Sequence, residues 1–218
     1  MQQLFLKFPI KTEYLVDDFF VSQANNQAFD YLCQWPNWGD SIYAKILLLY
    51  GECGSGKTHL VHIWQNLSSA RILSSGSYSD DKALILEDID NLKQEYLLHL
   101  INLAQENGQY LLLTASVAPV NLFFKLADLR SRILAIPSVS ITIPDQDLLK
   151  AVLLKELSDR QLKISPVAMD YIIPRIERSF SKLLKFIDKL DRESKRLKHP
   201  PTIPLIKQVL ERESACIS

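Results

Sequence analysis

Short apolar runs alternate with longer amphipathic stretches through the first two thirds of the chain. The runs have the length of buried strands, and the stretches between them have the three-to-four residue spacing that is typical of helices. This alternation predicts right-handed crossovers and an α/β fold with a mainly parallel five-stranded sheet, covered on both faces. We expect strands at 45–50, 71–74, 83–87, 110–115 and 139–143, and helices near 22–34, 57–67, 92–106 and 121–129.

The pattern changes after Pro144, where amphipathic helices follow one another without strands between them. In the third of these, Leu183, Ile187 and Leu190 recur every three or four residues and form one apolar stripe. A small all-helical subdomain is therefore expected at the C-terminal end. The predicted organisation is a tail at 1–12, an α/β subdomain at 13–145 and a helical subdomain at 146–218, with helices at 146–158, 166–176, 179–198 and 203–213.

The formal net charge of the 218 residues is zero, but the two parts of the chain differ in sign. Residues 1–149 carry 10 Lys and Arg against 16 Asp and Glu, a net charge of −6, whereas residues 150–218 carry 15 against 9, a net charge of +6. A basic C-terminal third is compatible with contact to DNA or to an acidic partner. Because its basic and acidic residues are interleaved, an ordinary solvated helix surface is the alternative.

Composition also indicates the cellular compartment in which the protein is found. No apolar run approaches the ~18 residues that cross a bilayer, which argues against a membrane partner, and the first residues lack the basic-then-apolar order of a signal peptide. Cys33, Cys53 and Cys216 are few and widely spaced, which is typical of a reducing compartment rather than of a disulfide framework. We therefore expect a cytoplasmic protein.

The segment Gly51–Thr58 matches the pattern G-x-x-x-x-G-K-[ST] and lies between an expected strand and an expected helix. In that context backbone N–H groups and a helix N-terminus point at one spot and bind phosphate together with the Lys57 ammonium. The Thr58 hydroxyl is placed to coordinate a phosphate-bound Mg²⁺. A glycine-rich turn with a chance lysine is the alternative. The predicted nucleotide-binding residues here are Gly51, Cys53, Gly54, Ser55, Gly56, Lys57, Thr58 and His59.

Two further expected strands end in polar residues. The apolar run at 83–86 is followed by Glu87 and Asp88, which would hold Mg²⁺ and polarise an attacking water. The alternative is a strand that ends in a charged turn. The next strand ends with the hydroxyls of Thr114 and Ser116, which would sense a γ-phosphate or orient water, with ordinary strand-end polarity as the alternative.

Two arginines, Arg130 and Arg132, stand just before the last expected strand. A guanidinium at this position could reach a phosphate within this chain or project into the site of a neighbouring protein. The alternative is a pair that satisfies the last carbonyls of a helix.

Together, GECGSGKTHL, the strand end ILED, LLLTAS and LRSR, followed by helices, resemble the AAA+ module of the bacterial replication initiator DnaA from about Asp18 onward. The resemblance is greatest to the short DnaA relatives called Hda, the regulatory inactivators of DnaA, because the sequence ends after the helical lid with LDRES and TIPLIKQVL. It implies an AAA+ P-loop module followed by a small helical lid.

The first residues carry a third part of the resemblance. The segment QLFLKF is similar to the short peptide by which Hda docks on the β sliding clamp. Its apolar residues fall on one side of an extended segment, as suits insertion into a partner's pocket. The alternative is an edge strand packed onto its own body. The clamp-binding residues implied are Gln3, Leu4, Leu6 and Phe8.

Hda-like proteins use their nucleotide mainly to organise the protein, so the resemblance implies bound ADP or ATP, usually ADP, with Mg²⁺. The position that matches the family's arginine finger is Arg132, which would act in trans on ATP held by DnaA. Asp88 takes the water-polarising position. The implied partners are DnaA and the sliding clamp, while DNA contact through the basic lid and a homodimer stay open.

Three positions depart from the DnaA pattern. Glu87-Asp88 replaces two aspartates, Ser116 replaces an aspartate, and Ser181 replaces the lid arginine, with Lys182 and Arg178 nearby. An error of one ångström in positioning costs ~10²-fold in rate. We therefore expect at most a weak intrinsic ATPase.

Two other functions fit parts of the sequence. A helicase-loader-like or initiator-like ATPase would use its own ATP turnover to remodel protein or DNA. A nucleoside or small-molecule kinase needs a substrate pocket and a basic lid, and the four-helix ending argues against it.

Overall fold

The structure is a computed structural model that describes residues 19–197 and 199–214. Its strands are β1 (Ile46–Tyr50), β2 (Arg71–Ile72), β3 (Ala83–Leu86), β4 (Tyr110–Ala115) and β5 (Ser138–Ser140). All of them pair in parallel, in the order β2-β3-β4-β1-β5. The predicted parallel five-stranded sheet is confirmed. Because β1 lies between strands that are distant from it in sequence, the loop that follows it emerges where crossovers leave in opposite directions.

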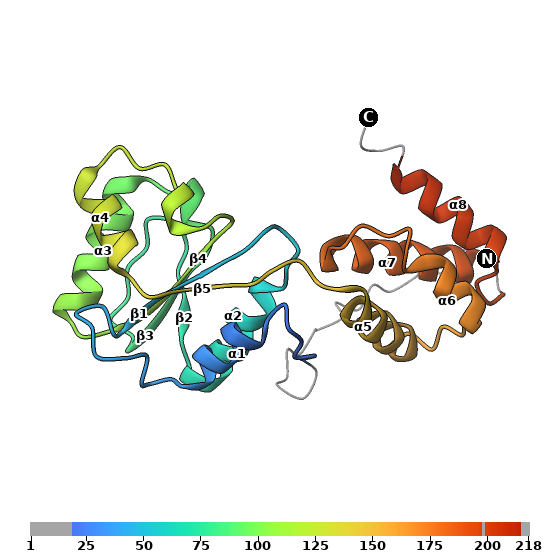
Figure 1. Cartoon of the computed structure of the whole chain (residues 1–218), viewed down its shortest axis with the longest axis horizontal. Helices are drawn as coiled ribbons and strands as arrows, with labels where there is room; N and C mark the ends of the chain where they lie inside the picture. Colours follow the sequence, from blue (N-terminus) through green and yellow to red (C-terminus); the bar gives the residue numbers. More distant parts are fainter. Residues whose placement is uncertain (1–18, 198, 215–218) are drawn as a thin grey trace, which may run out of the picture.

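Four helices cover the two faces of the sheet: α1 (Asn26–Cys33) and α2 (Lys57–Ser68) one face, and α3 (Gln94–Glu106) and α4 (Ala127–Ala135) the other (Figure 1). Successive residues of a strand point to opposite faces. In β1, Leu47 and Leu49 pack in the cluster that contains α1 and α2, and Ile46 and Leu48 pack in the cluster that contains α3 and α4. The continuous apolar run of β1 therefore reflects a strand buried on both sides.

The C-terminal helices are α5 (Gln146–Asp159), α6 (Pro166–Ile172), α7 (Phe180–Leu197) and α8 (Ile203–Ser214). They form a second lobe with its own core, which is joined to the sheet by the chain after β5 (Figure 1). Leu153, Phe186 and Ile206 are fully buried in that core. We refer to α5–α8 as the lid. No helix in the described ranges is long and apolar enough to cross a membrane.

The expected helix near 121–129 is wrong. A short 3₁₀ helix, η3, occupies Pro119–Asn121, and α4 begins only at Ala127. The side-chain oxygen of Gln94 accepts hydrogen bonds from the backbone N–H groups of Lys125 and Leu126, and Leu126 has an extended backbone just before the helix. A contact from α3 thus delays the helix, and the two arginines lie inside α4 rather than in a segment leading into β5.

Several other boundaries move, and the expected helix 166–176 ends at Ile172. The expected helix 22–34 begins at Asn26, because Ser22 and Asn25 close a turn first, with the Asn26 N–H donated to the Ser22 carbonyl. The expected strand 71–74 is reduced to two residues at the sheet edge. The expected strand 139–143 is shifted to 138–140, since Thr142 donates its N–H to Ala24 instead of to a strand.

The contribution of the N-terminal cap of α5 to the stability of the protein can be tested. The Asp145 carboxylate caps α5 by accepting the Leu148 N–H at 2.7 Å. Replacing it with alanine leaves that donor unsatisfied, so we expect Asp145→Ala to lower the free energy of unfolding by about 1 kcal/mol. Urea unfolding followed by far-UV circular dichroism measures the change.

The matched control is Asp147→Ala in the first turn of the same helix. Asp147 is exposed and does not cap the helix, so it acts through the helix dipole, an effect that salt screens. With unfolding measured at high ionic strength, its loss should therefore cost well below ~1 kcal/mol. A loss for Asp147→Ala as large as that for Asp145→Ala would contradict the capping role.

Candidate nucleotide-phosphate site

The glycine-rich segment forms one loop between the end of β1 and the start of α2, which begins at Lys57. Gly54 and Gly56 have φ values of +79° and +106°, in the left-handed region that favours glycine. At Gly51 an added Cβ would collide with the Ile141 carbonyl. The predicted residues Gly51–His59 thus lie together at the carboxyl end of β1, where open α/β sheets bind their ligands.

Lys57 folds back over this loop. Its ammonium donates to the carbonyls of Gly51 and Glu52 at 2.6 and 3.1 Å. Beneath it, Ser55 is only 3% exposed, and its hydroxyl has no hydrogen-bond partner among the described residues. Cys53 is exposed. The loop therefore has a buried base and an accessible rim.

The acid-ended strand reaches the same site. After β3, Glu87 lies against the start of α2, where its carboxylate accepts from the Thr58 hydroxyl at 3.3 Å. Asp88 is exposed, has a φ of +53° and donates its backbone N–H to the Thr114 hydroxyl at 2.9 Å. The structure thus brings Thr58 and Glu87 into contact and holds the Asp88 backbone on β4.

Thr58 and Glu87 fit a magnesium site. Mg²⁺ takes oxygen ligands and is commonly bound by one or two carboxylates together with phosphate oxygens and water. The Thr58 hydroxyl and the Glu87 carboxylate supply two such oxygens beside the loop. No group of three or more acids, histidines or cysteines suited to hold a metal alone occurs in the described part of the chain. A metal here would need phosphate as a further ligand.

The structure shows a hydrogen bond of Asp90 that the sequence did not predict. It lies in the 3₁₀ helix η2 (Ile89–Asn91), and its carboxylate accepts the backbone N–H of Ser116 at 2.7 Å. The other carboxylate oxygen is buried without a partner among the described residues. A negative charge therefore stands beside Ser116, although Ser116 itself is neutral.

The lid rests on the loop. The Phe180 N–H, at the start of α7, donates to the Gly54 carbonyl at 2.9 Å, and the Phe180 ring lies against Gly56. An added Cβ on Gly54 would collide with the Ser179 hydroxyl, which is 2.9 Å from that of Ser181. Ser181 is thus near the loop, whereas Lys182 pairs with Glu177 at 3.4 Å. The spacing of glycines and serines gave no signal for this contact.

Arg132 lies at the opposite edge of the sheet. Its Nε donates to Asp128 at 3.1 Å, and its Nη1 donates to Gln105, in the last turn of α3, at 3.2 Å. α3 ends before the start of β4, so this is the amino edge, whereas the loop is at the carboxyl edge. At ~3.3 Å per residue, the length of β1 separates the two by roughly 16 Å. Arg132 does not lie near this chain's own loop.

The side chain of Arg132 is 28% exposed. Partial burial disfavours its charged form, but the hydrogen bond and charge of Asp128, with a smaller contribution from Tyr43, outweigh it and raise the pKa of Arg132. Arg130, two residues earlier, is exposed. The residue pattern alone treated the two arginines alike and the family resemblance selected Arg132; the structure adds a difference in burial and in hydrogen-bond partners between them.

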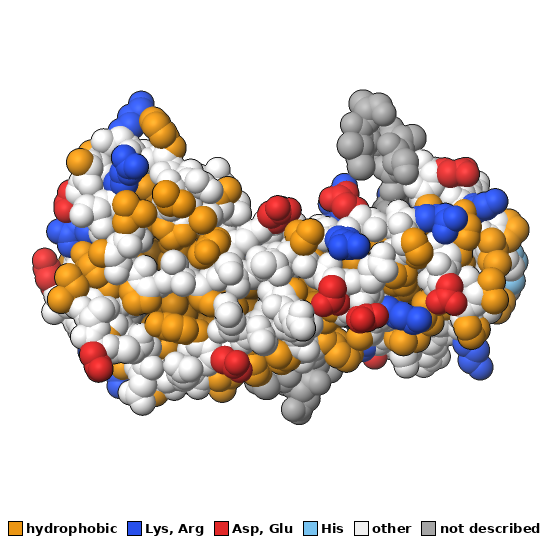
Figure 2. Space-filling model, viewed as in Figure 1, with side chains coloured by type: hydrophobic (Ala, Val, Ile, Leu, Met, Phe, Trp, Pro, Cys, Tyr) orange, Lys and Arg blue, Asp and Glu red, His pale blue; other side chains and the backbone are white. Residues whose placement is uncertain are grey.

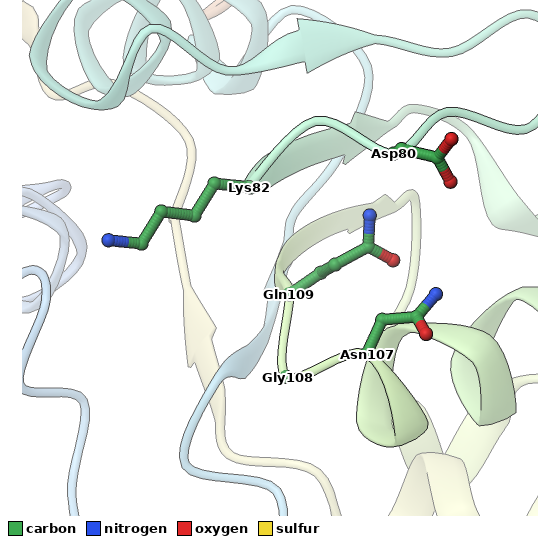
Figure 3. A pocket seen from close by; sticks show the side chains of 5 residues that line it. All are labelled: Asp80, Lys82, Asn107, Gly108 and Gln109. Atoms are coloured by element: carbon green, nitrogen blue, oxygen red, sulfur yellow. The ribbon is translucent and has the colours of Figure 1, made fainter.

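Two hollows among the described residues lie away from this site. One of about 280 Å³ is lined by residues that precede β3 and β4, among them Asp80, Lys82 and Gln109 (Figure 3). A second of about 250 Å³ adjoins it near Ile42. In Figure 3 the Lys82 ammonium points away from the other labelled side chains. Both lie at the amino edge of the sheet, so the phosphate site is inferred from the chemical groups of the loop.

Several basic residues of the lid pair with acids. Arg160 pairs with Glu156 and with Asp188, and Lys195 and Arg196 pair with acids of their own helix. Figure 2 shows basic and acidic side chains interleaved over the visible face of the lid. This distribution favours a solvated helix surface over a continuous basic patch.

The proposed clamp-binding residues lie outside the described residues. They are Gln3, Leu4, Leu6 and Phe8.

Two family models match the chain. The one described as "Hda, lid domain" matches residues 145–210, and the one described as "Bacterial DnaA ATPAse domain" matches residues 10–75. The first covers nearly all of the lid, and the second covers the glycine-rich loop.

Solved structures show the same fold. Domain III of the replication initiation protein DnaA from Thermotoga maritima is 18% identical, with a TM-score of 0.78, over 94% of this chain and 98% of that one. AMPPCP-bound DnaA from Aquifex aeolicus is 19% identical, with a TM-score of 0.67, over 88% of this chain and 71% of that one. The RuvB Holliday junction branch migration motor of Thermotoga maritima is 18% identical, with a TM-score of 0.68, over 91% of this chain and 71% of that one.

The contact between the loop and the lid can be tested directly. In Gly54→Ala the new Cβ collides with Ser179, which pushes α7 away from the loop. We expect the Phe180 amide to exchange its hydrogen about tenfold faster, because a left-handed alanine alone costs roughly 1–2 kcal/mol and the collision adds to it. Amide hydrogen exchange measures the rate.

Gly76→Ala is the matched control. Gly76 has a φ of +81°, close to that of Gly54, but an added Cβ there meets nothing within 4 Å. The control therefore carries the same backbone strain without the collision. Equal exchange at Phe180 in the two variants would mean that Gly54 does not set the position of the lid.

Proposed function

The chain belongs to the Hda family of DnaA-related AAA+ proteins, and from this premise we propose that it presents Arg132 to ATP bound by DnaA. As a DnaA-related AAA+ protein it is a replication regulator. The finer assignment is that hydrolysis occurs in DnaA and inactivates it. The observation that carries this proposal is the position of Arg132, partly exposed at the amino edge of the sheet while the phosphate loop lies at the carboxyl edge.

The loop would hold ADP or ATP with Mg²⁺. Its amides and the Lys57 ammonium supply the positive groups for the phosphates, and Thr58 and Glu87 supply oxygens for the metal. Lys57 would exchange its two carbonyl acceptors for phosphate oxygens. We propose that the nucleotide, bound beside the contact of Gly54 with Phe180, fixes the lid on the body.

Asp88 is the proposed water-polarising residue, and its environment supports only weak turnover. Its side chain is exposed, and its backbone is held by Thr114. Water around an exposed carboxylate weakens its electrostatic effect on a reacting group. We propose that hydrolysis in this chain's own site is slow.

Replacing the finger tests the function. Arg132→Ala removes the charge that would neutralise the transferring phosphoryl group, so stimulation of ATP hydrolysis in DnaA on clamp-loaded DNA should fall by ~10³-fold or more. Nucleotide affinity of the variant should be unchanged, since Arg132 lies far from the loop. Phosphate release and nucleotide titration measure the two quantities.

Arg130→Ala is the matched control, because it removes an exposed guanidinium of the same helix. It should retain stimulation. Normal stimulation by Arg132→Ala would refute the proposal. Robust turnover by this chain alone, abolished by Lys57→Ala, would instead favour the initiator-like or helicase-loader-like ATPase.

The N-terminal tail is proposed to bind the β sliding clamp. In the double variant Leu6→Ala/Phe8→Ala, two apolar anchors are lost, each worth roughly 1.5–3 kcal/mol when fully buried. We expect affinity for the clamp to fall at least tenfold in titration calorimetry. Phe5→Ala is the matched control, since Phe5 falls on the opposite side of an extended segment. Equal affinity of all three proteins would contradict clamp docking.

A further inference from the structure

We propose that Asp128 and Gln105 are positioning residues for Arg132, which hold its guanidinium in one orientation for an incoming phosphate. The proposal rests on the function proposed above and concerns how the arginine is presented. Neither residue would touch the phosphate or the reacting atoms.

Two elements hold the guanidinium at separate atoms. Asp128, one turn earlier in α4, accepts from Nε with both carboxylate oxygens, at 3.1 and 3.2 Å. Gln105, from α3, accepts from Nη1 at 3.2 Å. Because the guanidinium is a rigid plane, bonds at two of its nitrogens fix both its tilt and its rotation. The bonds to Asp128 and Gln105 do not use Nη2, and Tyr43 also lies close enough to the guanidinium to help raise its pKa.

Gln105 is itself oriented by the fold. Its side-chain nitrogen lies 3.5 Å from the Ile42 carbonyl, so that its oxygen is directed toward Arg132. Gln105 also belongs to the last turn of α3, whose packing against the sheet sets the position of the acceptor. The second anchor is therefore supplied by tertiary packing and not by α4 alone.

A simple surface ion pair does not account for this arrangement. An exposed pair at spacing i,i+4 contributes little and samples many rotamers. Here the second bond restricts Arg132, whose side chain is only 28% exposed, although Asp128 is 59% exposed. An arginine that is ordered before binding loses less side-chain entropy in the complex, and it starts near the geometry that stabilises the transition state.

If the two residues held Arg132 back instead of positioning it, their removal would change the rate of stimulated hydrolysis in the opposite direction. If Asp128 and Gln105 stored Arg132 in a retracted position, freeing the arginine would raise stimulation. If they position it, freeing the arginine lowers the maximal rate and has little effect on association with DnaA.

The experiment measures stimulated ATP hydrolysis by DnaA on clamp-loaded DNA as a function of the concentration of this chain. We expect Asp128→Ala to lower the maximal rate about 10- to 100-fold, as misplacement of a catalytic group does, while the half-saturating concentration changes little. Gln105→Ala should lower the maximal rate less. Asp128→Asn keeps an oxygen acceptor for Nε and should restore most of the rate.

Two controls separate positioning from general structure. Asp170→Ala breaks an exposed ion pair with Lys150 in the lid and should leave the rate unchanged. Adding Asp128→Ala to Arg132→Ala should cause no further loss, because a residue that acts through another has no effect in its absence. In NMR spectra, the Arg132 Nε–H should exchange with solvent faster in Asp128→Ala.

The outcomes distinguish the two proposals. If Arg132→Ala stimulates normally, the proposed function fails and this inference fails with it. If Arg132→Ala is inactive but Asp128→Ala and Gln105→Ala match the unmodified protein, or exceed it, only the positioning role is overturned. An additional loss from Asp128→Ala in the Arg132→Ala background would also overturn it.

Discussion

The parallel pairing of β1 with β4 on one side and with β5 on the other sets the geometry of the molecule. Each residue of β1 is buried or nearly so, and its side chains supply the inner surface of both hydrophobic clusters of the body. A strand held in this way cannot slide by one residue without turning its apolar side chains to the wrong faces. The position of the loop after Tyr50 is therefore fixed relative to the sheet, between the chain connections that leave β1 and its neighbours in opposite directions.

The two edges of this sheet separate two kinds of chemistry. The carboxyl edge gathers the glycine-rich loop, the contact of Thr58 with Glu87, and the acids of the β3 end. The amino edge carries Arg132 with its two acceptors. Since all strands point the same way, a group at the end of α4 is kept from its own chain's loop by the length of a strand. A separation of this kind suits an arginine that serves another protein.

The lid is linked to the body through the same loop. The Gly54 carbonyl accepts from the Phe180 N–H, and because Gly54 has no side chain, Ser179 can approach it closely. The glycine pattern that lets backbone amides face a phosphate thus also lets α7 come close. Any ligand that orders the loop is therefore coupled to the position of the lid. This coupling supports the proposal that a bound nucleotide fixes the lid on the body.

The sequence by itself determined the elements with the strongest local signals. The apolar runs of β1, β3 and β4, the loop pattern and the four lid helices follow from periodicity, glycine spacing and capping residues, because these act between near neighbours. The tertiary structure decided what depends on distant contacts. Gln94 binds the segment before α4, which begins at Ala127, and Thr142 donates its N–H to Ala24 instead of to a strand. Asp90, after β3, accepts from Ser116 at the end of the neighbouring strand β4. The local pattern of the sequence did not distinguish Arg130 from Arg132, although the family resemblance selected Arg132, and only the packing of α3 against α4 brought Gln105 to Arg132. Local patterns specify which elements form, but the orientation of a long side chain depends on partners that folding brings from elsewhere in the chain.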